Sequence, residues 1–281
     1  VLLSLPDRSP QLYTTEVKQE VLENTIDEVQ RSLIDPQSIP SGFFPQYQQL
    51  YDWVIRPLET ELANNKVKTL AFVLDGKLRN IPMSVLRDRD GYLVEKYAIA
   101  ITPGLQLLNP KPLTEVQLQV LTAGLSKSRD GFAELPNVPN ELGQIQQLKL
   151  SSQPLLDERF TTGELQKEVT ASGVPAVHLA THAQFSSKAE DTFILAWDRR
   201  INIKQLDSLL RGNPGDRRGA IELFVLSACE TASGDDRAAL GLAGVAVRAG
   251  ARSNLATLWR VSDASTPQIM TKFYSELGGS K

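Results

Sequence analysis

Apolar residues recur at helical spacing in two stretches of the first half of the chain. They predict a helix over residues 17–33 and another over residues 47–62, with a kink or a new start at Pro57. Runs rich in β-branched and aromatic residues predict strands at residues 1–6, near Leu12, at residues 68–74 and at residues 92–101. The first half is therefore expected to mix helices and strands.

Strand and helix patterns alternate through the second half. The predicted strands cover residues 116–123, 174–181, 222–228 and 253–258. The predicted helices lie at residues 142–148, from Thr161 onward, at residues 203–210, at residues 238–249 and from Asp263 onward. Glu164 follows Thr161 by three residues, which is a capping-box signal for a helix start.

This alternation predicts an α/β fold with mostly parallel sheets flanked by helices. Pro103, Pro110 and Pro112 interrupt the strand and helix patterns between the two halves of the chain. We therefore expect two α/β halves, residues 1–112 and residues 113–281. Because the sequence opens within a strand pattern and stops at Lys281 after two glycines and a serine, we expect it to be part of a longer protein.

One thiol and one imidazole follow two of the predicted strands. Cys229 is the only cysteine, and His182 ends the run that also holds the other histidine, His178. In open parallel sheets, ligands bind outside the carboxyl ends of the strands, so both side chains are expected at one crevice. A cysteine beside a histidine is the arrangement that a thiol nucleophile needs.

These residue types also have interpretations other than catalysis. A lone cysteine is often a small buried apolar residue. His178 lies inside its strand, beside Leu179 and Ala180, and is expected to be a packed histidine. The spacing of His178 and His182 suits a metal site on a helix, but in a strand residues four apart lie roughly 13 Å apart, too far for one ion.

Composition excludes several classes of protein. The formal net charge of −3 gives no general attraction to nucleic acid or to an anionic membrane, and no apolar run is long enough to span a bilayer. The apolar content of 41% supports a packed core. One cysteine cannot form an internal disulfide and fits a reducing compartment, so we expect a cytoplasmic protein.

Four sequence blocks resemble the CHAT family, caspase-like bacterial proteins usually fused to tetratricopeptide arrays. Residues 178–183 (HLATHA) and 225–231 (VLSACET) are similar to its two catalytic signatures. Residues 250–263 together with 272–274 are similar to its closing segment, and residues 73–82 to its N-terminal hallmark. The resemblance spans roughly residues 45 to 277, and the separation of 47 positions from the histidine to the cysteine is close to the roughly 50 of caspases.

The resemblance implies a caspase- or separase-like cysteine peptidase with an inactive N-terminal half and an active C-terminal half. Cys229 would be the nucleophile, and His182 would raise its thiolate fraction and protonate the leaving amine. The backbone N–H groups of Cys229 and Ala183 would form the oxyanion hole; many family members have glycine where this chain has Ala183. The resemblance implies a dyad without a third member, and no metal or other cofactor is expected.

Expectations for the substrate rest on acidic residues near the predicted site. Asp75, Asp191 and Asp263 are candidates to line a pocket for a basic side chain, and Asp263 is alternatively the N-cap of the last helix. The partners expected are a protein substrate and a tetratricopeptide or other regulatory region outside this chain, with no direct nucleic-acid contact. A catalytically silent scaffold or signalling module is the alternative function. A nucleotide- or flavin-binding domain is disfavoured because no glycine-rich phosphate loop follows a strand.

Overall fold

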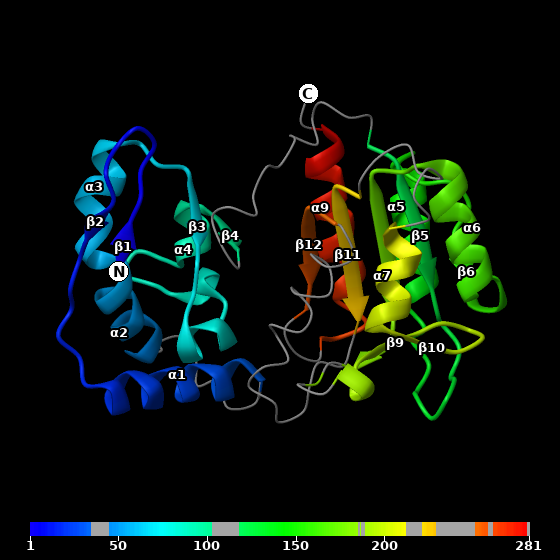
Figure 1. The fold of residues 1–281 in the computed structure, drawn as a ribbon, viewed down its shortest axis with the longest axis horizontal. Coiled ribbons are helices and arrows are strands. Elements are labelled where there is room, and N and C mark those ends of the chain that lie inside the picture. The colour runs from blue at the N-terminus through cyan, green and yellow to red at the C-terminus, as the bar shows by residue number, and fades with distance from the viewer. Residues whose placement is uncertain are drawn as a thin grey trace. The chain divides into compact units, whose positions relative to one another are not determined.

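The chain forms two compact units, Val1–Leu108 and Asn109–Lys281. The computed structural model describes residues 1–34, 45–102, 118–184, 186, 189–211, 221–228, 251–257 and 261–279 (Figure 1). The boundary expected at residue 112, the helix expected over residues 238–249 and Cys229 lie outside the described residues. Within the described residues, no helix combines the length and the apolar character that a membrane crossing requires.

The first unit, blue to cyan in Figure 1, packs helices against a pair of parallel strands. Its helices are α1 (Gln19–Ile34), α2 (Pro45–Val54), α3 (Glu59–Asn64) and α4 (Leu93–Lys96), with the 3₁₀ turns η2 (Arg56–Leu58), η3 (Gly76–Asn80) and η4 (Met83–Val85). Its strands are β1 (Leu2–Leu3) and β2 (Gln11–Leu12), which pair antiparallel, and β3 (Thr69–Phe72) and β4 (Ala98–Ile101), which pair parallel.

The apolar stripes of the first two predicted helices form the core of this unit. Ile26 of α1 and Leu50 of α2 are almost completely buried in the same cluster. The prediction of a new helix start at Pro57 is confirmed, because α2 ends at Val54 and η2 and α3 follow it. Proline is tolerated there because the first turn of a helix does not use its N–H groups.

The strand predicted over residues 92–101 is wrong in its first half. Residues Leu93–Lys96 form the short helix α4, and only Ala98–Ile101 form a strand. A carboxylate oxygen of Glu95 accepts a hydrogen bond of 2.6 Å from the backbone N–H of Tyr92, which caps the helix N-terminus. This local capping outweighs the β propensity of the segment.

The second unit, green to red in Figure 1, is built on a five-stranded parallel sheet. The sheet contains β5 (Val120–Gly124), β6 (Leu155–Leu156), β7 (Ala176–Thr181), β11 (Leu223–Ala228) and β12 (Ser253–Ala256), in the order β12-β11-β7-β5-β6. A small antiparallel sheet contains β8 (Ala183–Gln184), β9 (Phe193–Leu195) and β10 (Arg200–Asn202). The helices are α5 (Val138–Gln147), α6 (Thr162–Ser172), α7 (Ile203–Arg211) and α9 (Thr266–Gly279), with the 3₁₀ turns η7 (Asp157–Arg159) and η8 (Ala189–Asp191).

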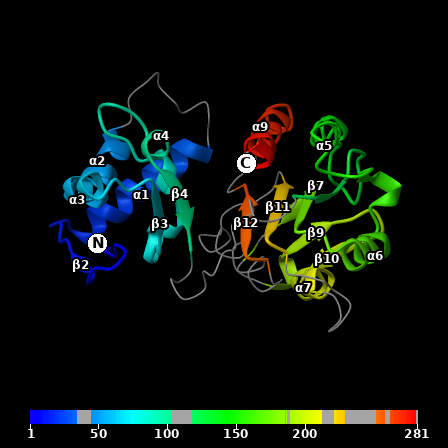
Figure 2. The ribbon, with the colours of Figure 1, turned by 90° about the horizontal axis from the view of Figure 1, so that it is seen from above.

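Helices cover both faces of the five-stranded sheet. Figure 2 shows α5 and α9 on one face and α6 and α7 on the other. Alternate residues of β7 serve the two faces: Val177 and Leu179 belong to the cluster with α6 and α7, whereas Ala176 lies in the cluster with α5 and α9. The predicted fold class, α/β with a mostly parallel sheet flanked by helices, is confirmed.

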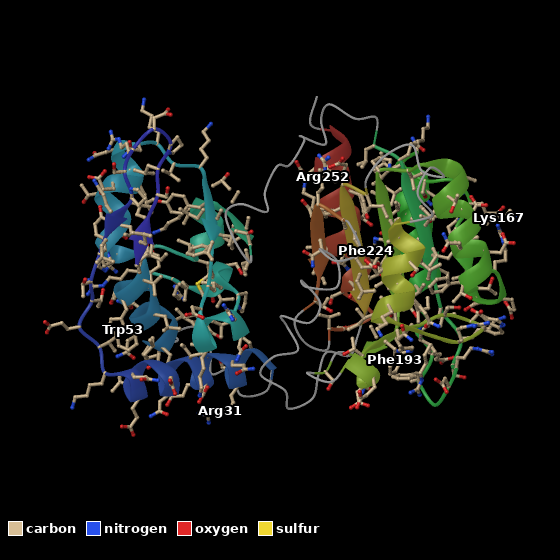
Figure 3. The ribbon with its side chains drawn as sticks, viewed as in Figure 1. Arg31, Trp53, Lys167, Phe193, Phe224 and Arg252 are labelled. Carbon is tan, nitrogen blue, oxygen red and sulfur yellow. The ribbon has the colours of Figure 1, made fainter. Side chains whose placement is uncertain are left out.

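The strand order places a topological switch point at the carboxyl ends of two central strands. The chain moves from β5 outward to β6 and then returns to the other side of β5 to form β7, β11 and β12. The order therefore reverses between β5 and β7, and in such sheets ligands bind outside the carboxyl ends of the strands at this point. In Figure 3, Phe193 lies near this carboxyl edge and Arg252 lies at the opposite edge.

Candidate active site

His182 directly follows β7 at this carboxyl edge and is held by the loop that follows β5. Its Nε2 lies 2.8 Å from the carbonyl oxygen of Ala133, and its ring stacks on Phe132 with centroids 4.8 Å apart and an interplanar angle of 28°. A carbonyl only accepts hydrogen bonds, so Nε2 carries the proton and Nδ1 holds the lone pair in the neutral ring. Only 6% of His182 is exposed, so this tautomer is set by the protein and not by water.

The loop over residues 126–137 is braced at its first end by Asp157. One carboxylate oxygen of Asp157 accepts the backbone N–H groups of Ser126 (2.7 Å) and Lys127 (3.2 Å), and the other accepts the Ser126 hydroxyl (2.7 Å). Asp157 is buried and has a φ of 50°, in the left-handed region that aspartate tolerates better than most residues. No sequence signal marks this residue, since it is one acidic residue among several in a polar turn.

The other end of the same loop is held by Asp263. Its Oδ2 accepts hydrogen bonds from the backbone N–H (3.0 Å) and the side-chain amide (2.8 Å) of Asn137, the residue that precedes α5. The expectation that Asp263 caps the last helix is wrong, because α9 begins at Thr266. The sequence identified the carboxylate but could not identify a partner 126 residues away.

A tight hairpin turn within this loop presents the two groups that contact His182. Arg129 and Phe132 exchange two backbone hydrogen bonds of 3.2 and 2.9 Å, and the residues between them, Asp130 and Gly131, have φ values of 53° and 84°. Positive φ at both central residues is the pattern of a type I′ turn, for which Asp-Gly is a preferred pair. Phe132 and the adjacent Ala133 are thereby set against the imidazole.

Ala183, the predicted oxyanion donor, is buried in β8. The backbone N–H of Leu195 donates to the carbonyl of His182 (2.8 Å), which makes His182 and Leu195 a hydrogen-bonded pair. The next pair, Ala183 and Ile194, is therefore a non-hydrogen-bonded pair of the antiparallel ladder. The N–H of Ala183 consequently points away from β9.

Cys229 lies outside the described residues, but the strand that leads to it is described. The last register pair between β11 and β7 joins Ala228 to Thr181. These two residues directly precede Cys229 and His182 in the sequence. Adjacent strands lie about 4.8 Å apart in the hydrogen-bonding direction.

The remaining pocket candidates lie on exposed turns. Asp191 is exposed at the end of η8, two residues before Phe193 of β9. Asp75 belongs to the first unit, where it accepts the N–H of Gly76 (2.8 Å) and forms an ion pair with Arg79 (3.2 Å). Neither residue is brought to His182 by a described contact.

His178 is fully buried, which confirms that it is a packed histidine. Its Nε2 donates to Oε1 of Glu141 in α5 (2.9 Å), and its Nδ1 lies 3.1 Å from the hydroxyl of Tyr274 in α9. Burial, assisted by the charge of Glu141, raises the pKa of Tyr274 well above its usual range. This network ties β7 to both helices on one face of the sheet.

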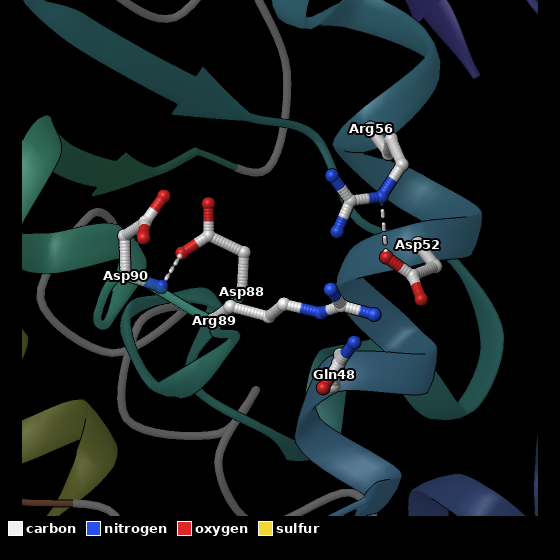
Figure 4. Close-up of a pocket in the computed structure, with 6 residues that line it drawn as sticks. All are labelled: Gln48, Asp52, Arg56, Asp88, Arg89 and Asp90. Atoms are coloured by element: carbon white, nitrogen blue, oxygen red, sulfur yellow. Dashed lines mark hydrogen bonds and ion pairs between the residues drawn. The ribbon is translucent and has the colours of Figure 1, made fainter.

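A polar pocket of about 350 Å³ also lies in the first unit (Figure 4). Two of its three carboxylates have partners: Asp52 pairs with Arg56 (2.6 Å), and Asp88 accepts the N–H of Asp90 (2.9 Å). The side chain of Arg89 extends toward Gln48. None of the six residues that line the pocket is a cysteine, serine, threonine or histidine, so they offer neither a thiol or hydroxyl nucleophile nor an imidazole. Among the described residues of both units, no group of three or more histidine, cysteine, aspartate or glutamate side chains could hold a metal ion.

Comparison with known families agrees with this architecture. The CHAT domain matches residues 45–281, and no curated protein matches the chain. CHAT domains form a caspase-like family related to cysteine peptidases, and the five-stranded parallel sheet flanked by helices is consistent with that fold. Because the match covers more than half of the sequence, the chain belongs to the CHAT domain family.

Proposed function

We propose that this protein is a cysteine endopeptidase that cleaves a protein partner with a dyad of His182 and Cys229. The observation that carries the proposal is the orientation of the His182 ring, whose Nε2 is bonded to a main-chain carbonyl. That bond leaves Nδ1 as the nitrogen that exchanges protons with a nucleophile or a leaving group.

The strand register supports the pairing of the two residues. Ala228 and Thr181 are neighbours in adjacent parallel strands, and the dyad residues come next in both. In our proposal Cys229 and His182 therefore face each other across the crevice beyond β11 and β7. The fixed imidazole would need no third side chain, because the Ala133 carbonyl orients it.

The reaction would follow the acyl-transfer course of a thiol nucleophile. The thiolate sulfur of Cys229 bonds to the scissile carbonyl carbon, and protonated His182 gives its proton to the departing amine. Water then hydrolyses the thioester, which releases the new carboxyl group and restores the thiol. The N–H groups of Ala183 and Cys229 would stabilise the oxyanion, and loss of one such donor typically costs about 100- to 1000-fold in rate.

We also propose that cleavage follows a basic residue. Of the three candidate carboxylates, Asp263 is bonded to Asn137 and Asp75 is paired with Arg79. Asp191 is exposed on the segment that follows His182, so we favour it as the group that attracts the basic side chain. A tetratricopeptide or other regulatory region outside this chain would bring the protein partner, in the cytoplasm, where a single thiol stays reduced.

Covalent labelling tests the proposal. A peptide acyloxymethyl ketone that carries arginine should add once to the protein, as measured by intact mass, and Cys229→Ala should abolish the addition. His182→Ala should slow labelling by roughly 100-fold or more, the range of general acid–base catalysis. His178→Ala is the matched control: it removes the buried link to Glu141 and Tyr274, so it should lower the unfolding free energy much more than the labelling rate of the folded protein.

Two results would contradict the dyad. Equal slowing of labelling in folded His182→Ala and His178→Ala proteins would show that His182 is not the catalytic histidine. Absence of labelling by arginine, acidic and aliphatic probes alike would favour a catalytically silent scaffold. Selective labelling by an acidic or aliphatic probe would keep the dyad but reject the basic preference.

A further inference from the structure

A surface hollow of about 690 Å³ lies beside the loop that holds His182. It is lined by residues 128–130, from the hairpin turn, and by residues 195–200, which connect β9 to β10. We name it the Arg129 hollow after the side chain on which its chemistry depends. Its volume lies within the range of small-ligand and side-chain pockets, roughly 300–1,000 Å³.

Two of the three arginines that line the Arg129 hollow are neutralised. Arg200 forms an ion pair with Asp130, and Arg199 forms one with Asp198 (3.1 Å). Both carboxylates of the hollow are therefore engaged. Among the described residues, the guanidinium of Arg129 has no carboxylate partner, so the lining has one uncompensated positive charge.

Asp198 is bonded to α6 and is not available to a ligand. It accepts hydrogen bonds from the backbone N–H (2.9 Å) and the hydroxyl (2.7 Å) of Thr162, in the first turn of α6. Burial acts to raise the pKa of Asp198, but the hydrogen bonds from Thr162 outweigh it and lower the pKa. Asp198 therefore stays ionised and anchors the β9–β10 connection to α6.

Trp197 gives Arg129 a fixed platform. The guanidinium carbon of Arg129 lies 4.2 Å from the centroid of the Trp197 ring, and the Lys127 ammonium lies 5.8 Å from the same ring. The backbone N–H of Trp197 donates to the carbonyl of Phe160 (2.8 Å), which fixes the position of the residue. A guanidinium stacked on an aromatic face keeps its N–H edge available for a planar carboxylate, with little entropy left to lose on binding.

We propose that the Arg129 hollow binds an acidic side chain of the polypeptide substrate, remote from the bond that is cut. The polypeptide nature of the ligand rests on the proposed function, whereas its carboxylate rests on the charge and stacking of Arg129. The hairpin that carries Arg129 reaches His182 through Phe132, three residues further along the chain. Arg129 and Phe132 are hydrogen-bonded partners across the turn, so their Cα atoms lie about 5.5 Å apart, and a bound acidic residue lies a few residues from the scissile bond.

Peptide binding tests the assignment without proteolysis. The probe is an eight-residue fluorescein-labelled peptide with three glutamates and no lysine or arginine, compared with its counterpart that has glutamine at those places. Fluorescence anisotropy with the Cys229→Ala protein should show tighter binding of the acidic peptide. Arg129→Gln should weaken that binding about tenfold, as expected for loss of a charge-assisted hydrogen-bond pair at a partly exposed site.

Matched variants separate the stacked arginine from general charge. Arg199→Gln removes the same charge from the same hollow, but its guanidinium is already paired, so the affinity should change less than about twofold. Arg129→Lys keeps the charge but loses the planar guanidinium that stacks on Trp197, so its affinity should lie between those of Arg129→Gln and the unchanged residue. Thermal unfolding of each variant checks that the fold is retained.

Three outcomes would overturn the inference. One is equal affinity for the acidic and the glutamine peptides, and another is an equal loss in Arg129→Gln and Arg199→Gln. The third is binding only of a phosphoserine version of the peptide, which would make the ligand a phosphopeptide. If cysteine labelling fails while the acidic peptide still binds through Arg129, the hollow stands and the peptidase proposal falls.

Discussion

Replacing Asp157 with alanine should destabilise the second unit more than any single surface change near the site. The carboxylate accepts three hydrogen bonds from Ser126 and Lys127, two of them 2.7 Å long. Removal of a hydrogen bond to a charged group costs about 1.5–3 kcal/mol, and such costs are not additive within one cluster. Alanine at a φ of 50° adds left-handed backbone strain. We therefore expect Asp157→Ala to lower the unfolding free energy by about 3–4 kcal/mol.

Two companion variants calibrate this value. Asp157→Asn keeps a carbonyl oxygen for the two backbone N–H groups and tolerates the left-handed conformation, so its cost should be about 1 kcal/mol. Glu158→Gln removes the neighbouring carboxylate, which is exposed and paired with exposed Lys127. Its unfolding free energy should match that of the unchanged protein, since exposed ion pairs contribute little.

Urea unfolding followed by tryptophan fluorescence measures these differences, because Trp197 lies in the second unit beside the segment that Asp157 supports. With a slope of about 2 kcal/mol per molar urea, the midpoint should fall by about 1.5–2 M for Asp157→Ala and about 0.5 M for Asp157→Asn. The rate of Cys229 labelling without urea should fall for Asp157→Ala as well, since the loop positions the Ala133 carbonyl. An Asp157→Ala midpoint equal to that of Glu158→Gln would refute the argument that Asp157 holds the loop.

Two further predictions use the packing around the sheet. Burial and Glu141 raise the pKa of Tyr274, so above about pH 10 the unfolded state releases the phenol proton while the folded state retains it. The unfolding free energy should therefore fall by up to about 1.4 kcal/mol per pH unit. Urea midpoints from pH 9 to 11 should fall less steeply for Tyr274→Phe than for the unchanged protein, and an identical slope would contradict this. A methyl group at Gly124 would lie 2.5 Å from the carbonyl oxygen of Ala180, so Gly124→Ala should cost about 1–3 kcal/mol or more. A methyl group at Gly143 on α5 would meet open space, so Gly143→Ala should raise the unfolding free energy by about 0.5–1 kcal/mol. Similar thermal midpoints for the two variants would contradict this difference and show that β5 and β7 can separate.

The position of His182 could be predicted because strand patterns are strong local signals. A run of apolar residues that ends at a polar group locates a strand end, and parallel order brings such ends to one edge. The buried role of His178 followed from the same pattern, because Leu179 and Ala180 beside it mark a strand interior. These inferences need only the sequence near each residue.

The groups that orient His182 could not be predicted from the sequence. The hydrogen-bond acceptor is the main-chain oxygen of Ala133, an atom that every residue carries. Asp157 and Asp263 brace the loop from positions distant in the chain, and nothing local distinguishes them from solvated acids. The α4 error has a different cause: Glu95 caps the helix through a single local hydrogen bond that the β-rich composition conceals.

The hydrogen bond between His182 and the Ala133 carbonyl determines which sequence changes this site can absorb. Substitution at position 133 leaves a main-chain oxygen in place, and the exposed side chain there has no part in the contact. Adding or deleting one residue between Asp157-bound Ser126 and Asp263-bound Asn137 would move the oxygen by about 3 Å and break the contact. Position 133 is thus free to vary in composition whereas the length of the loop is fixed, so homologous sequences should be aligned here by residue count.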